Sequence, residues 1–163
     1  MNEFDDVLNA NAQWVASYRF SSLPPRAARG LAVLTCMDSR IDPLGMLGLR
    51  PGDAKILRNA GARVTDDVLR TLVLATSLLD VRRVMVVAHT QCRMADGTED
   101  DVHAAIAAAG GPDTRSMSFL TTTDQEASLC SDVQRVRSSP YLPGIAVGGF
   151  VYDLATGALR EVC

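Results

Sequence analysis

The sequence predicts an α/β fold, a single domain in which helices flank a mostly parallel central β-sheet. Three observations predict it. The runs Leu31–Thr35 and Val84–Ala88 are continuously apolar, as expected of strands covered on both faces. Between them, residues 65–79 carry apolar side chains at helical spacing. Strands that alternate with helices form right-handed β-α-β units, and such units build parallel sheets.

The other elements follow in order along the chain. Apolar residues at helical spacing predict a first helix within residues 2–20, which Pro24 and Pro25 end. A second short strand is expected at Ala54–Leu57. Thr65 predicts the N-cap of the helix described above, because two acidic residues follow it and complement the helix dipole. Three later elements are bounded by turn or capping residues: helices at 99–109 and 124–137, and a closing strand or hairpin at 145–162.

Composition and charge restrict the class of function. A chain of 163 residues fits one domain with one core. The net charge of -3 gives no electrostatic reason to bind nucleic acid or an anionic membrane, and 5% aromatic residues offer few stacking platforms. The apolar runs are too short to cross a bilayer, and the acidic start, Met1–Asp6, does not resemble a secretory signal. We therefore expect a cytoplasmic protein.

Two of the predicted strands end in residues that bind metals. Cys36 follows the first apolar run, whereas His89 and Cys92 follow the run Val84–Ala88. Neighbouring parallel strands lie about 5 Å apart, so these three side chains can converge on one ion. Zinc favours thiolate and imidazole, and catalytic zinc sites use three protein ligands and keep the fourth position for water. The pattern therefore predicts one zinc ion per chain that activates a bound water.

Other interpretations of these residues stay open. His89 could be a buried histidine that bonds to the backbone beside inert thiols. A purely structural zinc would need a fourth protein ligand, for which Asp38, Cys130, Cys163 and His103 are candidates. We expect Cys130 and Cys163 to be small buried thiols, and His103 to be exposed on its helix.

At these residues the sequence resembles the β-class carbonic anhydrases. The resemblance covers nearly the whole chain and extends to residues 148–159. It implies a single domain over residues 1–163, with an N-terminal helical arm at 1–29 and an α/β core at 30–163. It rests on three motifs in this order: Cys36-Met37-Asp38-Ser39-Arg40, Arg58-Asn59-Ala60-Gly61 and His89-Thr90-Gln91-Cys92.

The resemblance implies the reversible hydration of carbon dioxide to bicarbonate and a proton. It assigns zinc ligation to Cys36, His89 and Cys92, and makes Asp38 and Arg40 a catalytic dyad. Asp38 would accept a hydrogen bond from the zinc-bound hydroxide and orient it, while Arg40 would hold the carboxylate in place. In some family members the aspartate moves onto the zinc, so Asp38 is also expected as a fourth ligand in a closed state. Activity would then rise above neutral pH.

The family also assembles as dimers or tetramers, with the N-terminal helix laid across a partner. A homodimer, alone or as a dimer of dimers, is therefore expected, and Trp14 and Tyr18 fit such a contact. A helix packed on its own domain is the alternative. One position departs from the family: Arg93 replaces a glycine whose backbone N–H faces the substrate. The family members that have a regulatory bicarbonate site carry a tryptophan where this chain has Ser39. We expect no such regulatory site here.

Two other functions compete with carbon dioxide hydration. The same fold and ligands can support a hydrolase acting on COS or CS2. A non-catalytic zinc-stabilised module is the third hypothesis. The presence of both Asp38 and Arg40 speaks against this module, because a structural zinc site has no use for an oriented carboxylate.

Overall fold

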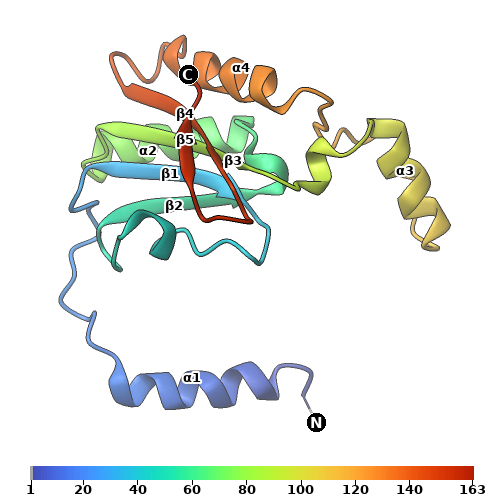
Figure 1. The fold of residues 1–163 in the computed structure, drawn as a ribbon. Coiled ribbons are helices and arrows are strands. Elements are labelled where there is room, and N and C mark those ends of the chain that lie inside the picture. Colours follow the sequence, from blue (N-terminus) through green and yellow to red (C-terminus); the bar gives the residue numbers. More distant parts are fainter. Residues whose placement is uncertain (1) are drawn as a thin grey trace.

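The central sheet of the computed structural model, which describes residues 2–163, has the strand order β2-β1-β3-β4-β5 (Figure 1). Strands β1 to β4 are parallel to one another, and β5 runs antiparallel to β4. The predicted α/β fold and its mostly parallel sheet are therefore confirmed. The strands are β1 (Leu31–Cys36), β2 (Ala54–Asn59), β3 (Arg83–His89), β4 (Ala146–Tyr152) and β5 (Leu159–Glu161).

Residues 2–163 also form four α-helices and three short 3₁₀ segments; α1 precedes the first strand, and the others lie between strands. Three of the helices begin at a side-chain cap: Thr65 caps α2, Thr98 caps α3 and Asp124 caps α4. All four helices lie within one to three residues of their predicted bounds. The helices are α1 (Asp5–Ser17), α2 (Asp66–Leu78), α3 (Glu99–Ala108) and α4 (Gln125–Arg137), and the 3₁₀ segments are Gly45–Leu47, Ala60–Ala62 and Arg93–Ala95.

The two faces of the sheet are covered differently. Helices α2 and α4 pack on one face, where Leu34, Leu72 and Val133 form part of the main core. The other face presents Val33 and Val87, which are covered by a loop segment around the first 3₁₀ turn rather than by an α-helix. Strand β1 is consequently buried along its whole length, as its continuous apolar sequence predicts.

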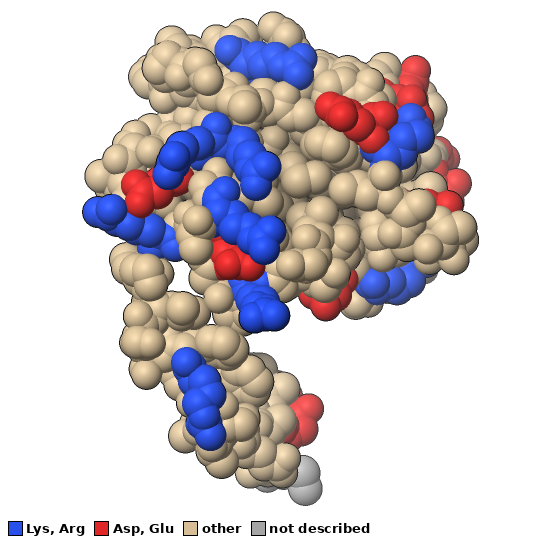
Figure 2. Space-filling view, turned by 60° about the vertical axis from the view of Figure 1, so that its left-hand side comes forward, with Lys and Arg blue, Asp and Glu red and all other residues tan. Residues whose placement is uncertain are grey.

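Helix α1 extends away from its own domain. It contains no buried residue, and Figures 1 and 2 show it standing apart from the sheet and its covering helices. The alternative of a helix packed on its own domain is therefore wrong. None of the helices that the structure describes has the length and apolar character needed to span a membrane. The apolar side chains that α1 and the residue after it expose are Val7, Leu8, Trp14, Val15 and Tyr18.

The prediction for Cys130 and Cys163 is wrong. The two residues form a disulfide, with their Cα atoms 5.8 Å apart, and both are half-buried. The β4-β5 hairpin brings the C-terminus back to α4, where Gly149 donates its N–H to the carbonyl of Cys163. Gly149 also leaves the room for this contact, because a Cβ there would lie 2.8 Å from Sγ of Cys163.

Candidate metal centre

The parallel pairing of β1 and β3 positions the predicted ligands. Cys36 and His89 are the last residues of these neighbouring strands, so their side chains leave the sheet at the same edge. The chain then turns back at Gln91, whose φ of 57° is left-handed, and this turn brings in Cys92. The ligand atoms of the three residues all lie within 4.8 Å of one another, and all three residues are buried.

The donor atoms of this cluster fit a zinc ion. Nδ1 of His89 lies 2.8 Å from the carbonyl of Thr90, so Nδ1 carries the proton and Nε2 keeps a free lone pair. Nε2 is a buried side-chain nitrogen for which the described residues provide no hydrogen-bond partner. The sulfurs of Cys36 and Cys92 lie 4.0 Å apart. Two thiolates on one tetrahedral zinc, at about 2.3 Å each, stand about 3.8 Å apart.

The two thiols influence each other's ionisation. The hydrogen bond from Cys92 lowers the pKa of Cys36, and the N–H of Gly61 lowers it further. The same thiol contact, followed by burial, raises the pKa of Cys92. Burial disfavours protonation of His89, but its contacts with Cys36 and with the carbonyl of Thr90 outweigh burial and raise its pKa. The cluster therefore favours one thiolate and resists a second, until a divalent cation compensates both charges.

Asp38 faces this cluster and is held by Arg40. The guanidinium donates from Nε to Oδ1 at 3.0 Å and from Nη2 to Oδ2 at 2.7 Å, and the backbone N–H of Arg40 donates to Oδ1 at 3.0 Å. These bonds hold the pKa of Asp38 well below its usual range. Because its pKa is low, the carboxylate is ionised. Its Oδ2 lies 3.9 Å from Nε2 of His89, beside the three donor atoms.

Two further side chains hold the backbone of the ligand loops in place, and the sequence did not reveal this role for either of them. Arg58, at the end of β2, donates to the carbonyls of Cys36, Asp38 and Ile41. The motif that contains Arg58 is visible in the sequence, but its hydrogen bonds to these three carbonyls are not. Gln125, at the start of α4, donates to the carbonyl of His89 at 3.0 Å, and no local pattern predicts this contact.

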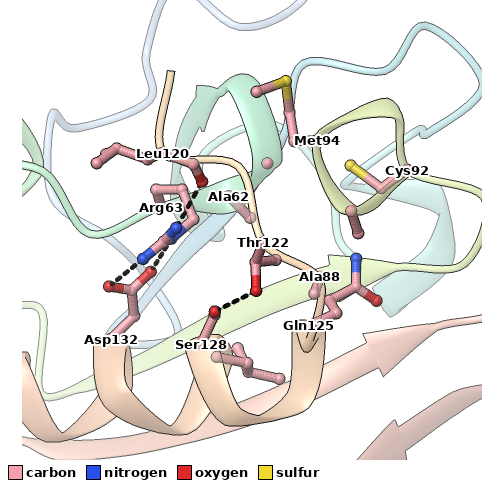
Figure 3. Close-up of a pocket in the computed structure, with 13 residues that line it drawn as sticks. Ala62, Arg63, Ala88, Cys92, Met94, Leu120, Thr122, Gln125, Ser128 and Asp132 are labelled. Carbon is pink, nitrogen blue, oxygen red and sulfur yellow. Dashed lines mark hydrogen bonds and ion pairs between the residues drawn. The ribbon is translucent and has the colours of Figure 1, made fainter. Parts of the chain in front are cut away.

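A small cavity lies beside the cluster, between the ligand loop and α4 (Figure 3). Its volume of about 10 Å³ is close to the space needed for one water molecule. Ala62 and Ala88 contribute apolar walls, and Cys92 closes one end. Figure 3 shows the ion pair of Arg63 and Asp132 at the opposite end of the cavity. Such a narrow space admits only a very small molecule.

The remaining candidate residues lie elsewhere. The disulfide removes Cys130 and Cys163 from the possible ligands. The prediction of an exposed His103 is wrong: the loop after α3 folds back, its side chain is only 14% exposed, and its Nδ1 lies 2.9 Å from Oγ1 of Thr114. Asp38 alone among the four candidates for a fourth ligand lies at the cluster. Arg93 is 62% exposed, and its guanidinium donates to the carbonyl of Asp96 and pairs with the carboxylate of the same residue.

Comparisons with known proteins show which family this chain resembles. A family model described as carbonic anhydrase matches residues 31–159. Beta-carbonic anhydrase 1 of Mycobacterium tuberculosis is 34% identical over 165 residues, which cover 99% of both chains. The crystal structure of a carbonic anhydrase from Streptococcus mutans superposes with a TM-score of 0.92 at 38% identity and covers 100% of this chain and 99% of that one. A carbon disulfide hydrolase from Acidianus is 30% identical over 82% of this chain and 77% of its own.

Proposed function

The chain belongs to the β-class carbonic anhydrases, and from this premise we propose that it hydrates carbon dioxide with one zinc ion bound by Cys36, His89 and Cys92. The products are bicarbonate and a proton. The observation that carries the proposal is the free Nε2 of His89, buried and aimed at two thiols whose spacing suits a tetrahedral zinc. When bound, zinc would lower the pKa of a coordinated water and so supply hydroxide as the nucleophile, although two thiolates partly neutralise the ion and would leave this water less acidic than three histidines do.

Asp38 and Arg40 act on that nucleophile as a dyad. Because Asp38 is ionised, it would accept a hydrogen bond from the nucleophile and so orient a lone pair toward the substrate carbon. Arg40 holds both carboxylate oxygens and therefore sets the direction of this acceptor. A non-catalytic zinc module would gain nothing from a carboxylate oriented in this way.

The proposal includes a closed state in which Asp38 becomes the fourth ligand. The 3.9 Å between its Oδ2 and Nε2 of His89 supports this state, because the carboxylate already borders the donor atoms. To reach the closed state, the Asp38 carboxylate would first have to break its hydrogen bonds with Arg40. With zinc bound, hydroxide would compete with this carboxylate for the fourth position better as the pH rises, so activity should increase above neutral pH. A flat rate profile between about pH 6.5 and 9, at full zinc occupancy, would contradict the closed state.

The proposal also includes a homodimer, alone or as a dimer of dimers. It divides the chain into an arm, residues 1–29, and an α/β core, residues 30–163. Helix α1 leaves Trp14 51% and Val15 64% exposed, and a second copy of the chain would cover these side chains. Sedimentation of the full chain beside a variant that lacks residues 1–29 tests this part. A dimer that persists without the arm would contradict the role of α1.

Stopped-flow measurements of carbon dioxide hydration on metal-quantified protein test the function. The wild type should contain about one zinc per chain and be active, and Cys36→Ser should lose both zinc and activity. Asp38→Ala should keep zinc and fold but lose about 10- to 100-fold in rate. The exposed Asp67→Ala is the matched control and should behave as the wild type.

Two outcomes would overturn the function. A zinc-loaded, folded wild type without activity would favour the non-catalytic module. Faster turnover of CS2 than of CO2 by the same sample would identify the hydrolase instead, in line with the similarity to carbon disulfide hydrolases.

A further inference from the structure

Gln91 connects the two loops that carry the ligands. It stands between His89 and Cys92, and both of its oxygens accept hydrogen bonds from Arg40 in the other loop. Nη1 of Arg40 donates to the side-chain Oε1 at 3.2 Å, and Nη2 donates to the backbone carbonyl at 3.3 Å. Together with the contact between the sulfurs of Cys36 and Cys92, these bonds join the Cys36–Arg40 loop to the His89–Cys92 loop.

Arg40 needs such a support. Its side chain is 51% exposed, and an exposed ion pair by itself holds a long, flexible side chain only weakly. With Gln91, the same guanidinium is bonded on two sides: Nε and Nη2 face Asp38, while Nη1 and Nη2 face Gln91. Contacts on both sides fix the plane of the guanidinium, and this plane fixes the orientation of the Asp38 carboxylate.

The backbone of Gln91 indicates that this arrangement has a cost. Its φ of 57° lies in the left-handed region, which is unfavourable for a residue with a side chain. Glycine would adopt this conformation more easily. Glutamine, however, brings a neutral acceptor to the guanidinium and does not compete with Asp38 by charge.

We propose that Gln91 is a positioning residue that holds Arg40, and through Arg40 the carboxylate of Asp38, in the orientation that the reaction requires. This inference rests on the proposed function, since it assigns a part to Gln91 in the same site. The side chain of Gln91 supplies the Oε1 contact, and the left-handed turn directs its carbonyl to the second contact.

Two substitutions separate positioning from a structural role. Gln91→Gly removes Oε1 but suits the left-handed backbone, so the free energy of unfolding should stay the same or rise while kcat falls about 3- to 10-fold. Gln91→Met keeps the length of the side chain without its acceptor and should lower kcat to a similar extent. In both variants, KM and zinc content should remain close to those of the wild type. Gln134→Met, on the exposed surface of α4, is the matched control and should leave kcat unchanged.

A double-mutant cycle shows whether Gln91 acts through Arg40. In an Arg40→Ala background, Gln91→Met should change kcat by less than about 1.5-fold, because the shared contact is already absent. An equal loss in both backgrounds, or an unchanged kcat in Gln91→Gly, would overturn the positioning role alone. A wild type without zinc or without carbon dioxide hydration would overturn the proposed function, and this inference with it.

Discussion

Replacing Asp132 by alanine should destabilise the fold by removing one partner of a buried ion pair. The carboxylate is 8% exposed and accepts from Nε of Arg63 at 2.7 Å and from the N–H of Val64 at 3.1 Å. In Asp132→Ala, the guanidinium of Arg63 stays mostly covered and keeps only its bond to the carbonyl of Leu120. The N–H of Val64, a buried residue, also loses its acceptor.

The expected loss of unfolding free energy is about 3–5 kcal/mol. A hydrogen bond to a charged group contributes about 1.5–3 kcal/mol, and a buried N–H without an acceptor costs about 1–3 kcal/mol, so the two losses account for this range. For a chain of this length, each kcal/mol lowers Tm by about 2–4 °C, which gives a decrease of about 6–20 °C. Urea and thermal unfolding should be compared at one protein concentration and one zinc content, because subunit association and metal both stabilise the folded state.

Asp67→Ala provides the control for this prediction. Asp67 pairs with Arg70 on the surface of α2, where the two side chains are 75% and 67% exposed. Its removal should cost no more than about 1 kcal/mol. A loss below about 1 kcal/mol in Asp132→Ala, equal to that of the control, would refute the argument. It would mean that water or another donor compensates both partners.

Three further predictions concern acidity, redox state and metal affinity. The N–H groups of Phe119 and Thr121 lower the pKa of Glu99. The stability that this carboxylate contributes is therefore fully present above the ordinary pKa of glutamate, about 4.3, and is lost as the pH falls through the lower pKa of the folded state. An NMR titration that finds an ordinary or raised pKa for Glu99 would contradict this prediction. Reducing the Cys130–Cys163 disulfide, whose cysteines are 33 residues apart, should lower the free energy of unfolding by about 4 kcal/mol. Both a phosphine reductant and the variant Cys163→Ser should therefore lower Tm. Alkylation of free thiols in the non-reduced protein would show instead that no disulfide forms. Zinc affinity should fall as the pH decreases from about 8 to 6, because protons compete with the ion for the thiolates and the imidazole. A zinc affinity that does not change with pH, measured by competition with a chelator, would argue against the Cys2His ligand set.

The sequence predicted the fold because its signals are local and periodic. Continuous apolar runs identified β1 and β3, and capping residues such as Thr65 marked the starts of helices. Cys36 and His89 could be brought together in advance because parallel strands end at the same edge of a sheet. The cytoplasmic location and the absence of nucleic-acid and membrane partners stay predictions.

Contacts between distant segments were beyond reach of local patterns. The Cys130–Cys163 disulfide depends on how the closing hairpin returns to α4, which neither segment encodes alone. His103 is covered because the loop after α3 turns back on it. The apolar spacing of α1 did not decide its placement either, since the same spacing suits a helix packed on its own chain and one that contacts a partner; only the family resemblance favoured the separate helix.

The contacts around the cluster explain how the donor atoms are positioned before a metal arrives. Arg58 fixes the backbone of the first ligand loop by its carbonyls, and Gln125 fixes the second loop at the carbonyl of His89. The Arg40–Gln91 contacts then join the two loops. A cation that binds here would not have to order the loops itself, so a smaller ordering cost would oppose its binding. The thiol pair, which resists a second negative charge, is in turn matched to a divalent ion.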